Sequence, residues 1–166
     1  LIKFVFLPLL YELLSGELEE WEVAPNYRNL LSTRGIVLID QFVEKVDLDK
    51  QVVITSSGQV VEYAQLVLST GSKSDDFGVK GVKEYSFMFN KYQDVSIIKK
   101  LILRLNSSNK TDQNLVIIGA GATGVELACK IADLLDDPSS IHLIELGERV
   151  LPNGKSFNQE QIELAL

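Results

Sequence analysis

The pattern of apolar and polar residues divides this chain of 166 residues into helical and extended stretches. Apolar residues recur at helical spacing before residue 16, between residues 90 and 105, and again after residue 124. Between residues 36 and 68, short segments alternate with tight turns, which is typical of antiparallel strands. We therefore expect helices over 8–14, 90–105, 125–136 and 159–166, an antiparallel meander over 41–62, and further strands over 65–69, 115–118 and 141–144.

One of these strands runs into a glycine-rich turn, and this turn points to a function. Leu115 to Ile118 is an unbroken apolar run, as expected for a strand buried on both faces of a parallel sheet. Gly119, Gly121 and Gly124 then follow with G-x-G-x-x-G spacing and open a helix. In this setting the first glycine permits the turn, the second lets the backbone approach a pyrophosphate, and the third lets helix and strand pack closely. The sequence therefore predicts a dinucleotide site at the start of the helix.

An acid after the next strand indicates which dinucleotide binds. Glu145 lies 21 positions after Gly124, near the spacing of the acid that binds the adenosine ribose hydroxyls in such sites. A carboxylate there would repel a 2′-phosphate, so we expect NADH rather than NADPH. The alternative is a glycine-rich turn in an unrelated α/β protein, with Glu145 as a solvated acid at a strand end.

Composition and charge exclude several other classes of function. The net charge of −7 argues against binding to nucleic acid. Cys129 is the single cysteine, so the chain has no internal disulfide and no Cys-x-x-Cys pair, which disfavours a disulfide reductase. His142 is the single histidine and has no cysteine or histidine partner at ligand spacing, so we expect no metal site.

The two ends of the chain suggest an internal fragment of a longer protein. The chain does not begin with Met, and residues 159–166 have a helical pattern that stops abruptly. The apolar stretch Leu1 to Leu14 contains charges and a proline and is too short to span a bilayer. It also lacks the cleavage pattern of a signal peptide.

The order of these segments resembles the flavoprotein reductases that contain two dinucleotide-binding domains. Thr70 and Gly71 match the Ala-Thr-Gly motif of that family, with Ser69 in place of the alanine. The resemblance implies an α/β fold with two Rossmann-like FAD/NAD(P)-binding domains, both incomplete in this chain. Residues 1–110 would form part of the FAD domain, with its β-meander and linker helix, and residues 111–166 the first half of an inserted NADH domain.

Within that superfamily the chain is most similar to type II NADH dehydrogenases, the single-chain NADH:quinone oxidoreductases. The resemblance rests on Phe6 to Leu13, which contains Pro-Leu-Leu-Tyr, on the segment Gly119 to Ala128, on Glu145, and on Arg149 to Pro152. It implies a respiratory, non-proton-pumping enzyme that passes a hydride from NADH to FAD and electrons on to a quinone. It also implies peripheral attachment to the cytoplasmic side of a membrane, through parts absent from this chain. We expect the isolated segment not to turn over.

The resemblance also assigns a role to one acid of the glycine-turn helix. Glu126 would face the nicotinamide near the flavin ring, as the candidate catalytic residue. From the sequence alone, Glu126 is equally an acid in the first turns of a helix, where the helix dipole favours it.

Five further residues are implied to contact FAD or the quinone. Thr70 and Gly71 would approach the FAD, and the backbone of Val43 would meet its adenine. Pro8 and Leu9 would line the flavin or quinone side. Without the resemblance, Val43 is a strand residue, and Pro8 and Leu9 are an ordinary helix start with a core leucine.

Two other functions stay open at this point. One is a related FAD-dependent reductase that delivers electrons to a protein such as ferredoxin or rubredoxin. The other is an inactive NAD-binding fragment. Whether the whole protein is a monomer or a homodimer, and which quinone it uses, does not follow from these residues.

Overall fold

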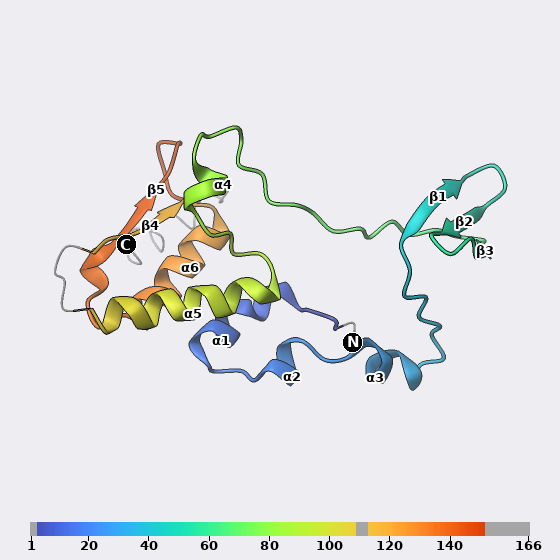
Figure 1. Cartoon of the computed structure of the whole chain (residues 1–166), viewed down its shortest axis with the longest axis horizontal. Helices are drawn as coiled ribbons and strands as arrows, with labels where there is room; N and C mark the ends of the chain where they lie inside the picture. Colours follow the sequence, from blue (N-terminus) through green and yellow to red (C-terminus); the bar gives the residue numbers. More distant parts are fainter. Residues whose placement is uncertain (1–2, 109–112, 152–166) are drawn as a thin grey trace.

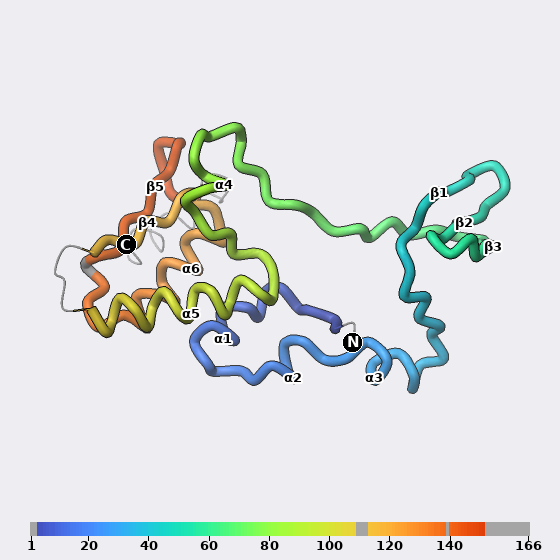
Figure 2. Tube along the Cα trace, in the orientation of Figure 1, coloured from blue at the N-terminus to red at the C-terminus, as the bar shows by residue number. Residues whose placement is uncertain are grey.

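The computed structural model describes residues 3–108 and 113–151, and places them in two parts that differ in character (Figure 1). Helices and a pair of parallel strands form the larger part, and an antiparallel meander stands apart from it. Figure 2 shows the two long connections, over residues 33–42 and 63–81, that join the meander to the helices. The expected helix over 159–166 lies outside the described residues.

The N-terminal region forms the short helix that the sequence predicts. The 3-10 turn η1 (Leu7–Leu9) contains Pro8 in its first turn and continues into α1 (Leu10–Ser15). Gly16 ends α1 with a φ of 84°, a left-handed conformation that favours glycine. Two further short helices follow, α2 (Glu20–Val23) and α3 (Tyr27–Ser32).

The antiparallel meander is confirmed. It consists of β1 (Val43–Asp47), β2 (Val52–Thr55) and β3 (Val60–Glu62), in the order β1-β2-β3. Val46 of β1 pairs with Val53 of β2, which pairs with Val61 of β3. The first turn is stabilised by a 3.1 Å hydrogen bond from the backbone N–H of Lys50 to Oδ1 of Asp47.

The prediction of a strand over 65–69 is wrong, because these residues form an irregular, extended connection. Val67 is 85% exposed and Leu68 is 72% exposed. An apolar run becomes a strand only where a neighbouring strand satisfies its backbone groups. Among the described residues no strand pairs with this segment.

The linker helix has the expected stripe of buried residues. After α4 (Val82–Tyr85), α5 runs over Tyr92–Asn106 and buries Val95, Ile98 and Ile102. The side chain of Asn106 fixes the C-terminal end of α5. Its Nδ2 donates to the carbonyl of Leu134 at 2.9 Å, and its Oδ1 accepts from the N–H of Asp136 at 3.1 Å.

Along the chain, the glycine motif follows one strand and precedes a second, parallel strand, as the sequence predicts. β4 (Leu115–Ile118) leads through the turn into α6 (Ala122–Ala132), and after η2 (Pro138–Ser140) the chain enters β5 (Ile141–Ile144). β4 and β5 pair in parallel, from Leu115 with Ile141 to Ile118 with Ile144. α6 packs against both strands (Figure 1).

The expectation that β4 is buried on both faces is wrong for the described residues. Ile117 points to the core and is 8% exposed, whereas Val116 and Ile118 are 50% and 65% exposed. The reason is that successive side chains of a strand point to opposite faces, and α6 covers one face of this pair. Apolar composition alone did not distinguish a covered face from an open one.

A single hydrophobic core joins the N-terminal helix to the glycine-motif unit. α1 packs against both α5 and α6, so residues from either side of position 110 share this core. The division of the chain into domains at about residue 110 therefore stays a prediction. The buried members are Leu10, Tyr11, Leu13, Leu14, Val23, Val95, Ile98, Ile102, Ile117, Leu127, Ile131 and Leu135.

Replacing Ile131 with alanine tests this core. Ile131 is 1% exposed, so the change leaves a cavity and is expected to lower the free energy of unfolding by about 2–5 kcal/mol. Leu103 of α5 is 67% exposed, so Leu103→Ala serves as the matched control, with an expected change below about 0.5 kcal/mol. Denaturant unfolding of the full-length natural protein measures both. An equal decrease in the free energy of unfolding of the two variants would contradict this assignment of the core.

Candidate functional site

The glycine turn lies where β4 ends, beside the end of β5. Gly119 has a φ of 97°, which requires glycine, and its N–H donates to the carbonyl of Ile144 at 2.8 Å. Gly121 is the N-cap of α6. Glycine has no side chain that could cap the first amides of the helix, so the backbone N–H groups that lack helical partners face the turn. Such a helix start binds anions.

The third glycine shows why the motif needs its spacing. A Cβ atom at Gly124 would lie 1.8 Å from the carbonyl oxygen of Gly119, which is far inside any permitted contact. A Cβ at Gly121 would meet no atom within 4 Å. Gly124 is therefore required by the fold of the turn, whereas the space beside Gly121 is open to a ligand. These two observations fit the pyrophosphate of a dinucleotide.

Glu145 lies at the same edge as the glycine turn, and its carboxylate binds the turn directly. Its Oε2 accepts a 2.7 Å hydrogen bond from the N–H of Ala120, and its Oε1 accepts a 2.9 Å hydrogen bond from the N–H of Gly147. The hydrogen bond from Gly147, and then that from Ala120, lower the pKa of Glu145. The carboxylate is therefore ionised and held at the turn, and its contact with a ribose stays a prediction.

Glu126 lies on α6 just after the glycine turn, and its side chain is exposed. Partial desolvation of the carboxyl group raises the pKa of Glu126, and the negative charge of Glu12 raises it further. Lys130, one turn along the helix, acts in the opposite direction. The structure therefore places beside the turn an acid that binds its proton more tightly than usual.

Sequence reasoning missed the two α1 residues that approach Glu126. Tyr11 is 7% exposed and belongs to the core in which α1 packs against α6. Desolvation is the main reason why the pKa of Tyr11 is raised, and the charges of Glu126 and Glu12 add to it. The only signal in the sequence was that Tyr11 and Glu12 directly follow Pro-Leu-Leu; their contact with α6 depends on helix packing.

The structure places the other predicted site residues on the meander, on the connection after it and on η1. Val43 begins β1 and is 59% exposed, and Thr70 and Gly71 lie exposed on the connection that follows the meander (Figure 1). Pro8 is exposed on η1, and Leu9 packs at the edge of the core. The roles of these five residues toward a flavin or quinone stay predictions.

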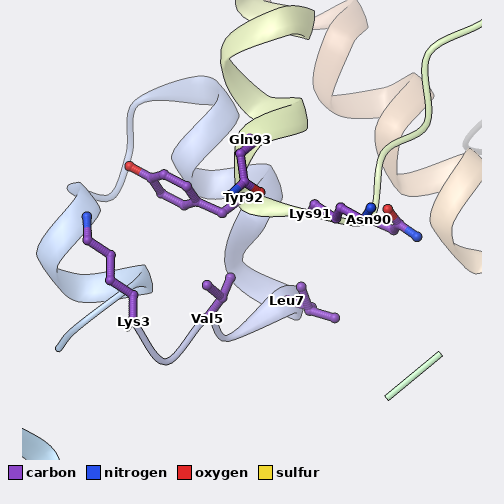
Figure 3. A pocket seen from close by; sticks show the side chains of 7 residues that line it. All are labelled: Lys3, Val5, Leu7, Asn90, Lys91, Tyr92 and Gln93. Atoms are coloured by element: carbon purple, nitrogen blue, oxygen red, sulfur yellow. The ribbon is translucent and has the colours of Figure 1, made fainter. Parts of the chain in front are cut away.

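A pocket of about 480 Å³ lies elsewhere, between the N-terminal segment and the start of α5 (Figure 3). Of the two lysines that line it, Lys3 already has partners, because it forms an ion pair with Glu20 and its Nζ lies 5.2 Å from the centre of the Tyr92 ring. No residue that the sequence predicts for the dinucleotide site lines this pocket. The lining residues are Lys3, Val5, Leu7, Asn90, Lys91, Tyr92 and Gln93.

His142 lies on β5, where its Nε2 is 2.9 Å from Oδ1 of Asn114. Among residues 3–108 and 113–151, no three His, Cys, Asp or Glu side chains gather as a metal site would require. Within the same ranges, no helix has both the length and the apolar character needed to cross a membrane.

Curated relatives match nearly the whole chain. It is 30% identical over 168 residues to a demethylphylloquinone reductase of Synechocystis sp., covering 99% of this chain and 42% of that protein. It is 31% identical over 174 residues to the alternative NAD(P)H-ubiquinone oxidoreductase C1 of Arabidopsis thaliana, covering 95% of this chain and 34% of that protein. These names confirm the resemblance to NADH:quinone oxidoreductases. The chain thus spans less than half of the relatives it matches.

Solved structures agree with the fold. The sulfide:quinone oxidoreductase of Aquifex aeolicus superposes on 97% of this chain and 40% of its own, with a TM-score of 0.77 at 22% identity. The expected α/β fold of the FAD/NAD(P)-binding reductases is therefore confirmed. A family model matches residues 3–166. The chain belongs to the pyridine nucleotide-disulphide oxidoreductase family.

Proposed function

We propose that this chain binds NADH at the glycine turn and forms part of an NADH:quinone oxidoreductase. The observation that carries the proposal is the edge where β4 and β5 end, at which the glycine turn and the carboxylate of Glu145 meet. The quinone in the names of the curated relatives supports the choice of acceptor. The chain spans 42% and 34% of these two relatives, so the activity proposed is that of the whole protein.

Different groups at the turn would bind different parts of the nucleotide. The first amides of α6 would bind the pyrophosphate, which the open space beside Gly121 lets approach the backbone. Glu145 would accept hydrogen bonds from the ribose hydroxyls. An ionised carboxylate has about four lone-pair sites, so the bonds from Ala120 and Gly147 leave capacity for a ligand.

Bound NADH would supply a hydride, which FAD in the whole protein would pass on as two electrons to a quinone. Glu126, near the start of α6, would lie closest to the reacting end of the nucleotide, as the resemblance implies. Val43 is exposed on β1 of the meander, and Thr70 and Gly71 are exposed on the connection that follows it. Their contact with FAD is proposed for the whole protein, together with that of Pro8 and Leu9.

The setting of the whole protein is proposed on the same basis. We infer a non-proton-pumping enzyme of a respiratory chain, attached peripherally to the cytoplasmic side of a membrane. A quinone is the small-molecule partner. The homodimer stays an alternative to the monomer, to be decided by measuring the mass of the protein in solution.

The proposed function is tested by measuring oxidation of NADH and of NADPH by the full-length natural protein, each with and without a soluble quinone analogue. We expect quinone-dependent oxidation of NADH, with NADPH a poor substrate because of Glu145. Oxidation of NADH that ignores the quinone but reduces a ferredoxin or rubredoxin would replace the quinone by a protein acceptor. A protein without bound flavin and without any oxidation would contradict both and leave a nucleotide-binding module.

A further inference from the structure

We propose that Gly147 is a positioning residue that sets the choice between NADH and NADPH, because its backbone N–H holds the carboxylate of Glu145 at the glycine turn. The inference deepens the proposed function and rests on it, since the orientation of Glu145 affects this choice only where a dinucleotide binds. The names of the relatives assign no role to Gly147.

The carboxylate of Glu145 has a donor at each of its two oxygens. The N–H of Gly147 donates to Oε1 at 2.9 Å, and the N–H of Ala120 donates to Oε2 at 2.7 Å. The terminal torsion of a glutamate is broad when nothing restrains it, so a carboxylate with one donor can still rotate. Donors at both oxygens fix the plane of the group. Each oxygen keeps a further lone-pair site, which is available to a ribose hydroxyl.

The donor at Oε2 belongs to a part of the site that the fold itself fixes. Ala120 is 0% exposed, and its carbonyl accepts a 2.8 Å hydrogen bond from the N–H of Leu151. One residue earlier, the N–H of Gly119 donates to the carbonyl of Ile144 at 2.8 Å. These bonds tie the glycine turn to both ends of the segment 144–151. The position of the Ala120 N–H is therefore set before any ligand arrives.

The donor at Oε1 comes instead from the loop that carries the acid. Gly147 lies two residues after Glu145 and is exposed. Without its N–H, the carboxylate would be anchored at one oxygen only and would be free to turn toward solvent. The pKa of Glu145 agrees with this arrangement, because it is lowered first by the hydrogen bond from Gly147 and then by that from Ala120.

A fixed carboxylate discriminates between the two nucleotides more strongly than a mobile one. The ribose hydroxyls of NADH would donate to a group that is already oriented, so less conformational freedom is lost on binding. The 2′-phosphate of NADPH would meet a negative charge that cannot turn away. Loss of the Gly147 N–H is therefore expected to weaken the binding of NADH and to relieve part of the repulsion of NADPH.

Two substitutions at position 147 separate the N–H from the side chain. A Cβ there would lie 3.5 Å from Oε1 of Glu145, which is an ordinary van der Waals contact, and the φ of Gly147 lies outside the left-handed region. Gly147→Ala therefore keeps the donor, whereas Gly147→Pro removes it, because proline has no N–H. Thermal unfolding verifies that both variants are folded.

The first experiment is calorimetry of NAD⁺ and NADP⁺ binding to the full-length natural protein and to both variants. These oxidised nucleotides carry the same adenosine ends as NADH and NADPH and cannot reduce a bound flavin. In Gly147→Pro the ratio of the Kd for NADP⁺ to that for NAD⁺ should fall by about threefold to tenfold, the size of one hydrogen bond, whereas Gly147→Ala should keep the wild-type ratio. A merely structural role would weaken both nucleotides equally. An unchanged ratio in folded Gly147→Pro would overturn the proposal.

The second experiment measures hydrogen exchange of the Gly147 amide at neutral pH and needs no proline variant. In protein with ¹⁵N-labelled glycine, the signal that is missing in Gly147→Ala identifies this amide. We expect its exchange to be slow for an exposed loop and to accelerate in Glu145→Ala, which removes the acceptor. The amide of Gly58, which donates to the carbonyl of Thr55 in the meander, is the control and should not change.

The exchange measurement also separates this proposal from the proposed function, because it needs no nucleotide, flavin or quinone. Equal exchange of the Gly147 amide in wild type and Glu145→Ala, in a protein that prefers NAD⁺, would overturn the positioning role and leave the proposed function in place. Slow exchange in a protein that binds neither nucleotide would overturn the proposed function, and with it the effect of this contact on the choice of nucleotide.

Discussion

Replacing Gly124 with alanine is expected to destabilise the protein and to abolish NADH binding together. The added Cβ would lie 1.8 Å from the carbonyl oxygen of Gly119, and the obstacle is backbone rather than a flexible side chain. Relief requires the turn and α6 to move apart, and overpacking of this kind costs about 3 kcal/mol. Unfolding by denaturant and calorimetry with NADH measure the two effects on the full-length natural protein.

Gly121→Ala is the matched control for this prediction. Gly121 has a φ of −71°, which alanine adopts readily, and its added Cβ would meet no atom within 4 Å. The free energy of unfolding should change by less than about 0.5 kcal/mol. NADH binding should nevertheless weaken, by about tenfold or more, if the pyrophosphate approaches the backbone here. Normal stability and normal NADH binding in Gly124→Ala would contradict the geometry of the turn.

The second large effect is expected from Glu145→Gln, which should change the choice of nucleotide. The variant keeps the shape of the side chain but loses the charge that would repel the 2′-phosphate of NADPH. We expect the ratio of kcat/KM for NADPH to that for NADH to rise about tenfold, which corresponds to about 1.4 kcal/mol. Steady-state kinetics of the full-length natural protein with both nucleotides measures this ratio. An unchanged ratio would remove Glu145 from the ribose site.

The same variant should change how stability depends on pH. The hydrogen bonds from Gly147 and Ala120 lower the pKa of Glu145 in the folded protein. A lowered pKa contributes stability above the unfolded value, and this contribution is lost as the pH falls through the folded value. As the pH falls below the ordinary pKa of a glutamate, the melting temperature of Glu145→Gln should therefore decrease less steeply than that of wild type. Identical slopes would indicate that the two hydrogen bonds add little in solution.

Local patterns in the sequence determined most of the elements and the centre of the site. The spacing of Gly119, Gly121 and Gly124 after an apolar run predicted the turn between β4 and α6, and Glu145 was expected at the adjacent strand end. The reason is that these features depend on residues close together in sequence. A left-handed φ at Gly119 and a missing Cβ at Gly124 are properties of a few consecutive residues.

Only the tertiary structure decided which apolar surfaces are covered and which charges meet. Val116 belongs to the same apolar run as buried Ile117, and Val67 to a similar run, yet both valines are exposed because no described element packs against them. Glu17 and Lys130 are separated by more than a hundred residues, and they form an ion pair at 2.9 Å where α1 packs on α6. Burial and electrostatic interaction depend on distances in space, and hydrophobic packing sets those distances without any local pattern to announce them.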